Sequence, residues 1–169
     1  MSIKVSRYFK TNINKNIKKE VLKTAKQIET YLGNKEVYER MKKANTKGTS
    51  SQIIQKIIEE IAKPLGFTDE KEGLFKKYSN SGLRPDFYKK LGKTGILMEV
   101  ERGKTTTNNM DLLDIYKCHI CEEANHLFLF VPIEVSHTKN IYKNVCKKVF
   151  NFFIKKNYLN IDSLIVYGY

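Results

Sequence analysis

The chain is 169 residues long, carries a formal charge of +13 and has an isoelectric point near 9.5. This length suits one domain, with or without an arm, and is enough to bury a substantial core. The chain has no run of about eighteen apolar residues and no signal-peptide core, which argues against a membrane partner and predicts a soluble cytoplasmic protein.

The positive charge lies in the two flanks of the chain. Residues 1–50 carry 13 basic and 4 acidic side chains, residues 51–132 carry 12 of each, and residues 133–169 carry 6 and 2. Such a surface favours a polyanionic partner. We therefore expect the flanks to hold a nucleic-acid backbone while the neutral centre acts on it.

Residues 12–31 predict an amphipathic helix, which Gly33 ends. A shorter helix is expected over 34–43, followed by a polar joint over 46–51. We therefore expect a basic helical N-terminal arm, residues 1–48, attached to a core of residues 49–169. The outer lysines of the first helix either grip phosphates or form an ordinary solvated helix face. They include Lys18, Lys19 and Lys23.

Ser50 or Ser51 caps the next predicted helix, which ends at Pro64 and Gly66. Its isoleucines form one apolar stripe between residues 53 and 61. Glu60 lies about 20° round the helix from the first of them. It would either lean over a neighbouring site as an outer metal ligand or remain a solvated helix glutamate. After this helix, residues 67–78 give a weak strand signal.

Residues 84–104 place three carboxylates at the ends of two apolar strands. Asp86 opens the first strand, and Glu99 and Glu101 close the second. Alternate side chains of a strand point to opposite faces, so the two glutamates share a face. Met98 and Val100 point the other way.

A tight connection between Gly92 and Gly95 would pair these strands as a hairpin and bring Asp86 beside the glutamates. Carboxylates held so close repel one another unless a divalent cation lies among them. Their hard oxygen ligands suit Mg²⁺, with Mn²⁺ able to substitute.

A helix that begins after the capping-rich residues 105–109 and runs to about Ala124 carries Lys117 in the middle of its apolar arc. The arc is formed by Met110, Leu113, Ile120, Cys121 and Ala124. A lysine there is costly to bury unless it is paired. Glu99 and Glu101 are its expected partners, and the alternatives are snorkelling or a slight rotation of the helix. Cys118 and Cys121 lack a second ligand pair, so we expect no structural zinc.

The C-terminal third predicts a buried central strand over 126–132, a basic helix over 140–157 and a last strand over 163–169. Together with the preceding elements, this order predicts an α/β sandwich with a mixed sheet.

The succession of Pro85-Asp86, Glu99-x-Glu101, a helix and an apolar strand resembles the PD-(D/E)XK nuclease superfamily over residues 50–132. It is most similar to the restriction-enzyme branch of BamHI and BglII, in which a Glu-x-Glu or Glu-x-Gln pair precedes Gly-Lys; here Gly103-Lys104 follows. The resemblance implies a three-layer sandwich with a central sheet and Mg²⁺-dependent hydrolysis of DNA phosphodiesters. Glu101 occupies the position of the usual motif lysine, so Lys104 or Lys117 would replace it.

The residues fit that chemistry in named roles. Asp86 and Glu99 would hold the ion, with the Val100 carbonyl as a further ligand. Glu101 would bind a second ion or orient the attacking water. Lys117 or Lys104 would offset charge on the phosphate. The expected DNA contacts are Arg84, Arg102, Lys104 and the lysines of the first helix.

We therefore expect a metal-dependent endonuclease of restriction type that cuts double-stranded DNA. One site per chain requires two chains to cut both strands, which predicts a homodimer. A structure-specific repair or junction nuclease would share these carboxylates. A non-catalytic DNA-binding relative would bind DNA without cutting it. A small-molecule metalloenzyme would not need so basic a surface.

Overall fold

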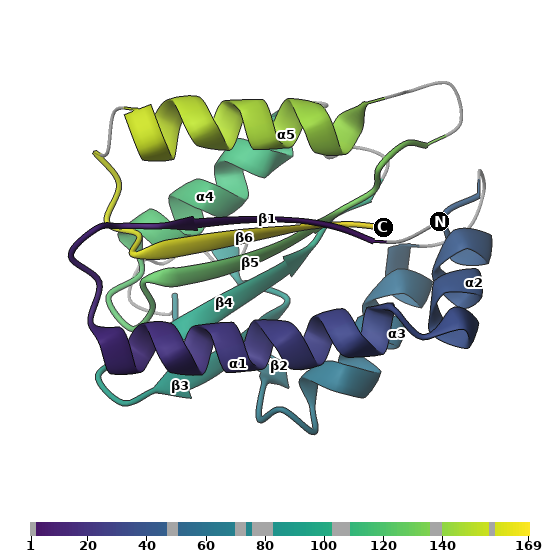
Figure 1. The fold of residues 1–169 in the computed structure, drawn as a ribbon, viewed down its shortest axis with the longest axis horizontal. Helices are drawn as coiled ribbons and strands as arrows, with labels where there is room; N and C mark the ends of the chain where they lie inside the picture. The colour runs from purple at the N-terminus through teal and green to yellow at the C-terminus, as the bar shows by residue number, and fades with distance from the viewer. Residues whose placement is uncertain are drawn as a thin grey trace.

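The computed structural model describes residues 3–46, 51–69, 74–75, 83–102, 109–135, 140–155 and 158–169. Their strands form one mixed sheet in the order β1-β6-β5-β4-β3-β2 (Figure 1). The strands are β1 (Lys4–Phe9), β2 (Thr68–Asp69), β3 (Phe87–Leu91), β4 (Thr94–Val100), β5 (His126–Val131) and β6 (Ser163–Gly168). β4, β5 and β6 are parallel, and the other pairs are antiparallel.

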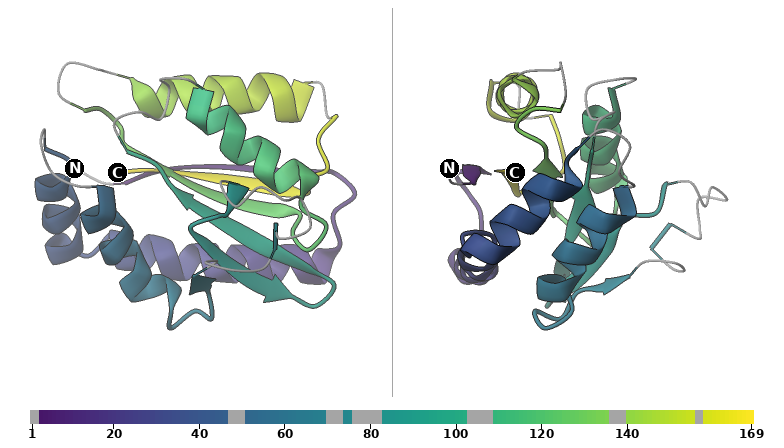
Figure 2. Two further views of the ribbon diagram at one scale, coloured as in Figure 1. Left: turned by 180° about the vertical axis from the view of Figure 1, so that it is seen from behind. Right: turned by 90° about the vertical axis from the view of Figure 1, so that its right-hand side faces the viewer.

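Helices cover both faces of this sheet and complete a three-layer α/β sandwich, as the sequence predicts (Figure 2). On one face lie α1 (Lys15–Leu32), α2 (Lys35–Ala44) and α3 (Ser51–Ala62). On the other lie α4 (Met110–Ile120) and α5 (Ile141–Val149), and α5 continues into the π-helical segment η4 (Phe150–Lys155). No helix in the described part of the chain is long and apolar enough to cross a membrane.

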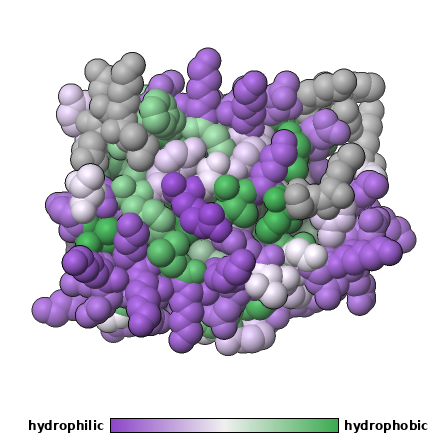
Figure 3. Space-filling view, viewed as in Figure 1, coloured by the Kyte–Doolittle hydropathy of each residue, from purple (hydrophilic) through white to green (hydrophobic). Residues whose placement is uncertain are grey.

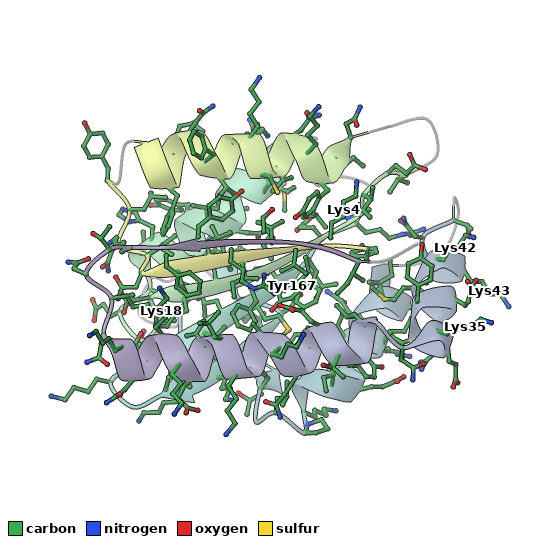
Figure 4. The ribbon with its side chains drawn as sticks, viewed as in Figure 1. Lys4, Lys18, Lys35, Lys42, Lys43 and Tyr167 are labelled. Carbon is green, nitrogen blue, oxygen red and sulfur yellow. The ribbon has the colours of Figure 1, made fainter. Side chains whose placement is uncertain are left out.

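β5 is the central strand that its apolar run predicts, and all six of its side chains are buried. Phe128 and Phe130 face α1, whereas Leu127 and Leu129 face α4 and α5. A parallel strand covered on both faces needs such a run because it has no solvated side. Tyr167 of β6 stacks on Phe130, with ring centroids 4.6 Å apart, in the layer between the sheet and α1 (Figure 4).

The residues expected to form a separate basic arm, 1–48, are part of the core over their described portion, 3–46. Val21, Ala25 and Ile28 of α1 are fully buried in the same apolar cluster as Phe128 and Ile165 of the sheet. The lysine-rich outer face of α1 suggests an arm, but its inner stripe supplies part of one layer of the sandwich.

β1 is the strand that the sequence analysis missed. It pairs antiparallel with β6, from Lys4 opposite Gly168 to Phe9 opposite Ser163. An edge strand tolerates charged residues, and its lysine and arginine are a common protection against edge-to-edge association. For this reason its sequence, KVSRYF, lacks the apolar alternation typical of an inner strand.

The predicted hairpin of β3 and β4 is present, with Leu91 opposite Thr94 and Gly92 at a φ of +60° in the turn. Gly95 lies within β4, where a Cβ would lie 2.8 Å from the Lys89 carbonyl oxygen. The first glycine therefore permits the turn, and the second permits close packing of the backbone.

Several predicted boundaries change. α4 ends at Ile120 rather than near Ala124, and α5 ends at Val149 as a regular α-helix. Of the weak strand expected over 67–78, the structure shows β2, and residues 70–73 and 76–78 lie outside the described residues.

The buried His126 predicts a loss of stability in acid. Burial lowers the pKa of His126 to about 4, and its Nδ1 lies 2.8 Å from Ser163 Oγ. Below pH 6.5 the unfolded chain binds a proton that the folded protein does not, so the free energy of unfolding falls as the pH drops towards 4. Between pH 7 and pH 5, His126 should lower the free energy of unfolding by about 2 kcal/mol.

Urea unfolding of the parent and of His126→Asn at pH 7 and pH 5 gives the change in the free energy of unfolding with pH for each protein. The difference between these two changes is the contribution of His126. Equal pH dependence in the two proteins would show that His126 is not the group responsible.

Candidate active site

Asp86 is held by two hydrogen bonds at the start of β3. Its Oδ2 accepts from the Val100 backbone N–H at 2.8 Å, and its Oδ1 accepts from Gln55 Nε2 of α3 at 2.8 Å. Burial raises the pKa of Asp86 despite these two donors. The hairpin thus places Asp86 against the end of β4, as the sequence predicts, and α3 fixes the orientation of its carboxylate.

Glu99 and Lys117 form a buried ion pair between β4 and α4. Lys117 Nζ donates to Glu99 Oε1 at 2.7 Å, and the residues are 6% and 3% exposed. Burial lowers the pKa of Lys117, but the charges of Glu99 and Asp114 outweigh it and the net shift is upward. Burial, and then the charge of Asp114, raise the pKa of Glu99. The expected contact between Lys117 and Glu99 is therefore present.

Asp114 is the site residue that the sequence analysis did not find. It is completely buried, and its Oδ1 lies 2.8 Å from Lys117 Nζ, outside ordinary hydrogen-bond geometry. The buried face of α4 also contains Asp111, Ile115 and Cys118, whereas Met110 and Leu113 are only half-buried. The available signal was the three-residue spacing to Lys117, which places both side chains on one face of a helix.

Gln55 is a second residue that the apolar pattern of its helix concealed. It lies between Ile54 and Ile57, and its half-buried amide reaches Asp86. Helix spacing alone could not show that this border position faces a carboxylate contributed by a later strand.

Glu101 lies just beyond β4 on the same face as Glu99. Burial, and then the negative charge of Asp114, raise the pKa of Glu101 to about 8. Its backbone N–H donates to the Phe130 carbonyl at 2.8 Å, and its carbonyl accepts from the Tyr169 hydroxyl. The backbone is therefore held in register with β5, and both predicted glutamates face the α4 layer.

Glu60 does not join this group of carboxylates. It is exposed and accepts hydrogen bonds from Tyr31 and Arg40. The hollow that it lines is distinct from the cleft that contains Asp86. The position of Glu60 on the border of the apolar stripe did not show its partner, which is Arg40 of α2. Glu60 is therefore not placed as an outer metal ligand.

An open cleft of about 480 Å³ leads to Asp86. It is lined by Gln52, Gln55, Lys56, Glu59, Asp69, Arg84, Pro85, Asp86 and Phe87. The predicted DNA contact Arg84 lies in this cleft, and Lys56 of α3 lies beside it. Two basic residues therefore lie near Asp86, Lys56 on α3 and Arg84 just before β3.

The other predicted DNA contacts are dispersed. Arg102 donates to the Thr46 carbonyl at the end of α2, and Lys104 lies outside the described residues. Lys18 lies over the Phe9 ring, 4.8 Å from its centroid (Figure 4). Lys19 and Lys23 are exposed on the outer face of α1. Hydrophilic side chains cover that face of α1 in the space-filling view (Figure 3). α1 lies on the side of the sheet opposite to α4.

The donor set has the chemistry of a site for a hard divalent cation. Asp86, Glu99, Glu101 and Asp114 are carboxyl groups whose pKa values are all raised by burial, so an added cation would favour their ionised forms. In the described part of the chain, no three His, Cys, Asp or Glu side chains converge closely enough to hold a metal ion as they stand. The ammonium of Lys117 lies between two of these carboxylates instead. The residues therefore fit such an ion once Glu99 is released from Lys117.

The fold matches that of a restriction endonuclease. The chain aligns with a crystal structure of the restriction endonuclease BglII complexed with a DNA 16-mer, with a TM-score of 0.50 and 14% sequence identity. The match covers 99% of this chain and 76% of BglII. No protein-family model matches the sequence, and no curated protein matches it. The restriction-endonuclease-like fold predicted from the sequence is confirmed.

Lys117→Met should strongly destabilise the metal-free protein. It leaves Glu99 and Asp114 buried without their cation, a change that typically costs about 3–5 kcal/mol. Because the folded-state pKa of each carboxyl is already raised, and rises further in the variant, the cost of ionising it increases with pH. The deficit should therefore be larger at pH 8 than at pH 5.

Urea unfolding in EDTA at the two pH values tests this expectation. Lys63→Met is the control, because the exposed pair of Lys63 and Glu59 should contribute less than about 1 kcal/mol. A pH-independent deficit in Lys117→Met would indicate lost packing rather than lost charge.

Proposed function

We propose that this protein is a Mg²⁺-dependent endonuclease, of restriction type, that hydrolyses phosphodiester bonds of double-stranded DNA. The observation that supports this most is the meeting of Asp86, Glu99 and Lys117 at the end of one strand in a restriction-endonuclease-like fold. Mn²⁺ would substitute for Mg²⁺, since both prefer carboxylate oxygens.

The side chains divide the work by position. Asp86 and Glu99 would hold the ion, and the Val100 carbonyl is a further candidate ligand beside them. Bound Mg²⁺ would supply a Lewis acid that polarises the phosphate and lowers the pKa of water. The Lys117 ammonium would offset negative charge that develops on the phosphate. Lys104 remains an alternative for that role.

Glu101 is suited to handle the proton of the attacking water. In the metal-free protein burial raises the pKa of Glu101 to about 8, so Glu101 is more basic than an ordinary carboxylate. A carboxylate oxygen of Glu101 would orient the water or accept its proton.

One such site per chain leads us to propose a homodimer on DNA, so that each copy cuts one strand. The mass of the complex in solution, measured by sedimentation with and without duplex DNA, tests this. Cleavage of branched DNA with no cleavage of plain duplex would favour a junction nuclease instead.

Glu99→Gln should abolish cleavage while leaving duplex binding unchanged or tighter. The amide keeps the shape of Glu99 but removes a metal ligand and a negative charge near phosphate. We expect a cleavage rate at least about a hundredfold lower on plasmid DNA with Mg²⁺.

Glu60→Gln is the matched control, because it makes the same chemical change on a glutamate paired with Arg40 outside the cleft. It should cut at the parent rate. Full activity in Glu99→Gln would show that the site is misplaced. DNA binding without any cleavage by the parent protein would identify a non-catalytic relative.

The cleft beside Asp86 should contact the DNA backbone. Replacing both Arg84 and Lys56 with Gln should weaken duplex binding and reduce the slope of log K against log[salt] by about two, because fewer counterions are released. The comparison variant Lys19→Gln/Lys23→Gln removes the same charge from the exposed face of α1. An unchanged slope in the cleft variant and a reduced slope in the α1 variant would assign the DNA surface to α1.

A further inference from the structure

α4 carries two completely buried aspartates one turn apart, and their partners differ. Asp111 pairs with Lys148 of α5, whose Nζ lies 3.0 Å from Oδ1 and 2.9 Å from Oδ2. That pair joins two helices on one side of the sheet. Asp114 instead faces Lys117, three residues along its own helix, inside the cluster that contains Glu99.

A buried carboxylate is unfavourable unless its pairing compensates for lost hydration. Asp114 does not link α4 to another helix through this ion pair, because its partner belongs to α4 itself. What the pair fixes is the position of the Lys117 ammonium. A lysine side chain is long and flexible, and a single ion pair with Glu99 leaves it free to follow that glutamate.

We propose that Asp114 is a positioning residue that holds the Lys117 ammonium in the active site when Glu99 is engaged by another cation. The two contacts are nearly equal in length, 2.7 Å to Glu99 and 2.8 Å to Asp114, and they approach the ammonium from a strand and from a helix. With Glu99 bound to a metal ion, Asp114 would keep the Lys117 ammonium in place to offset charge on the phosphate. This inference rests on the proposed nuclease function, which assigns that role to Lys117.

The test compares Asp114→Asn, Lys117→Met and the double variant with Asp111→Asn as the matched control. Both asparagine variants remove a buried charge and an ion pair from the same helix with little change in volume. Single-turnover cleavage at saturating DNA with Mg²⁺ gives the rate, and fluorescence anisotropy gives the Kd for DNA. Circular dichroism at the assay temperature establishes that each variant is folded.

We expect Asp114→Asn to cut at least about tenfold more slowly with an unchanged Kd, since a misplaced catalytic group lowers the rate of the chemical step. Adding Asp114→Asn to Lys117→Met should cause no further loss, because Asp114 acts through Lys117. Asp111→Asn should cut within about twofold of the parent. Asp114→Glu retains the charge and should therefore cut faster than Asp114→Asn but more slowly than the parent. It replaces Asp114→Asn if that variant does not fold.

Three cleavage results would overturn the proposal: parent activity in Asp114→Asn, equal losses in Asp114→Asn and Asp111→Asn, or losses that multiply in the double variant.

A readout independent of cleavage is acetylation of Lys117 by acetic anhydride, followed by mass spectrometry in the presence of Mn²⁺. Asp114→Asn should label faster than Asp111→Asn. If the parent protein does not cut DNA, the proposed function fails, and this labelling still decides whether Asp114 positions Lys117. Equal labelling would then reject it.

Discussion

The Lys117 ammonium is the constraint on which the rest of the site depends. Four carboxyl groups lie near the end of β4, and burial raises the pKa of each. Lys117 lies between Glu99 and Asp114 and makes it possible to bury that much negative charge in the absence of a metal ion. Because these pKa values are raised, a further cation placed among the carboxyl groups would favour their ionised forms.

The sandwich explains why these groups meet. β4 lies between two helical layers, so its side chains alternate between the apolar cluster of α1, α2 and α3 and the layer of α4 and α5. Met98 and Val100 anchor one face, which directs Glu99 towards α4. Gln55 approaches Asp86 from α3. The carboxylates of this site are therefore held by elements on both sides of the sheet.

Much of this could be predicted from the sequence, because short-range patterns determine it. The hairpin spacing places Asp86 beside Val100, and strand alternation places Glu99 and Glu101 together. A lysine in an apolar arc indicates a buried acidic partner. Asp114 could not be predicted in the same way, because sequence patterns assign carboxylates to the solvent side and the phase of α4 depends on its packing. The prediction of Glu60 as an outer metal ligand was wrong for a related reason, because its partner Arg40 belongs to a helix whose position depends on the tertiary structure.

The pairing of the first strand with the last has a consequence for how the chain is made. β1 lies beside β6, and the residue pairs between them join residues 4–9 to residues 163–168. The sheet can therefore be completed only after β6 has left the ribosome, although β4 and α4 emerge earlier. Pairing across such a separation is slow relative to local structure formation. During synthesis the charged groups of the site would therefore remain partly hydrated until the sheet is complete. The edge of β5 would be exposed to neighbouring chains over the same period.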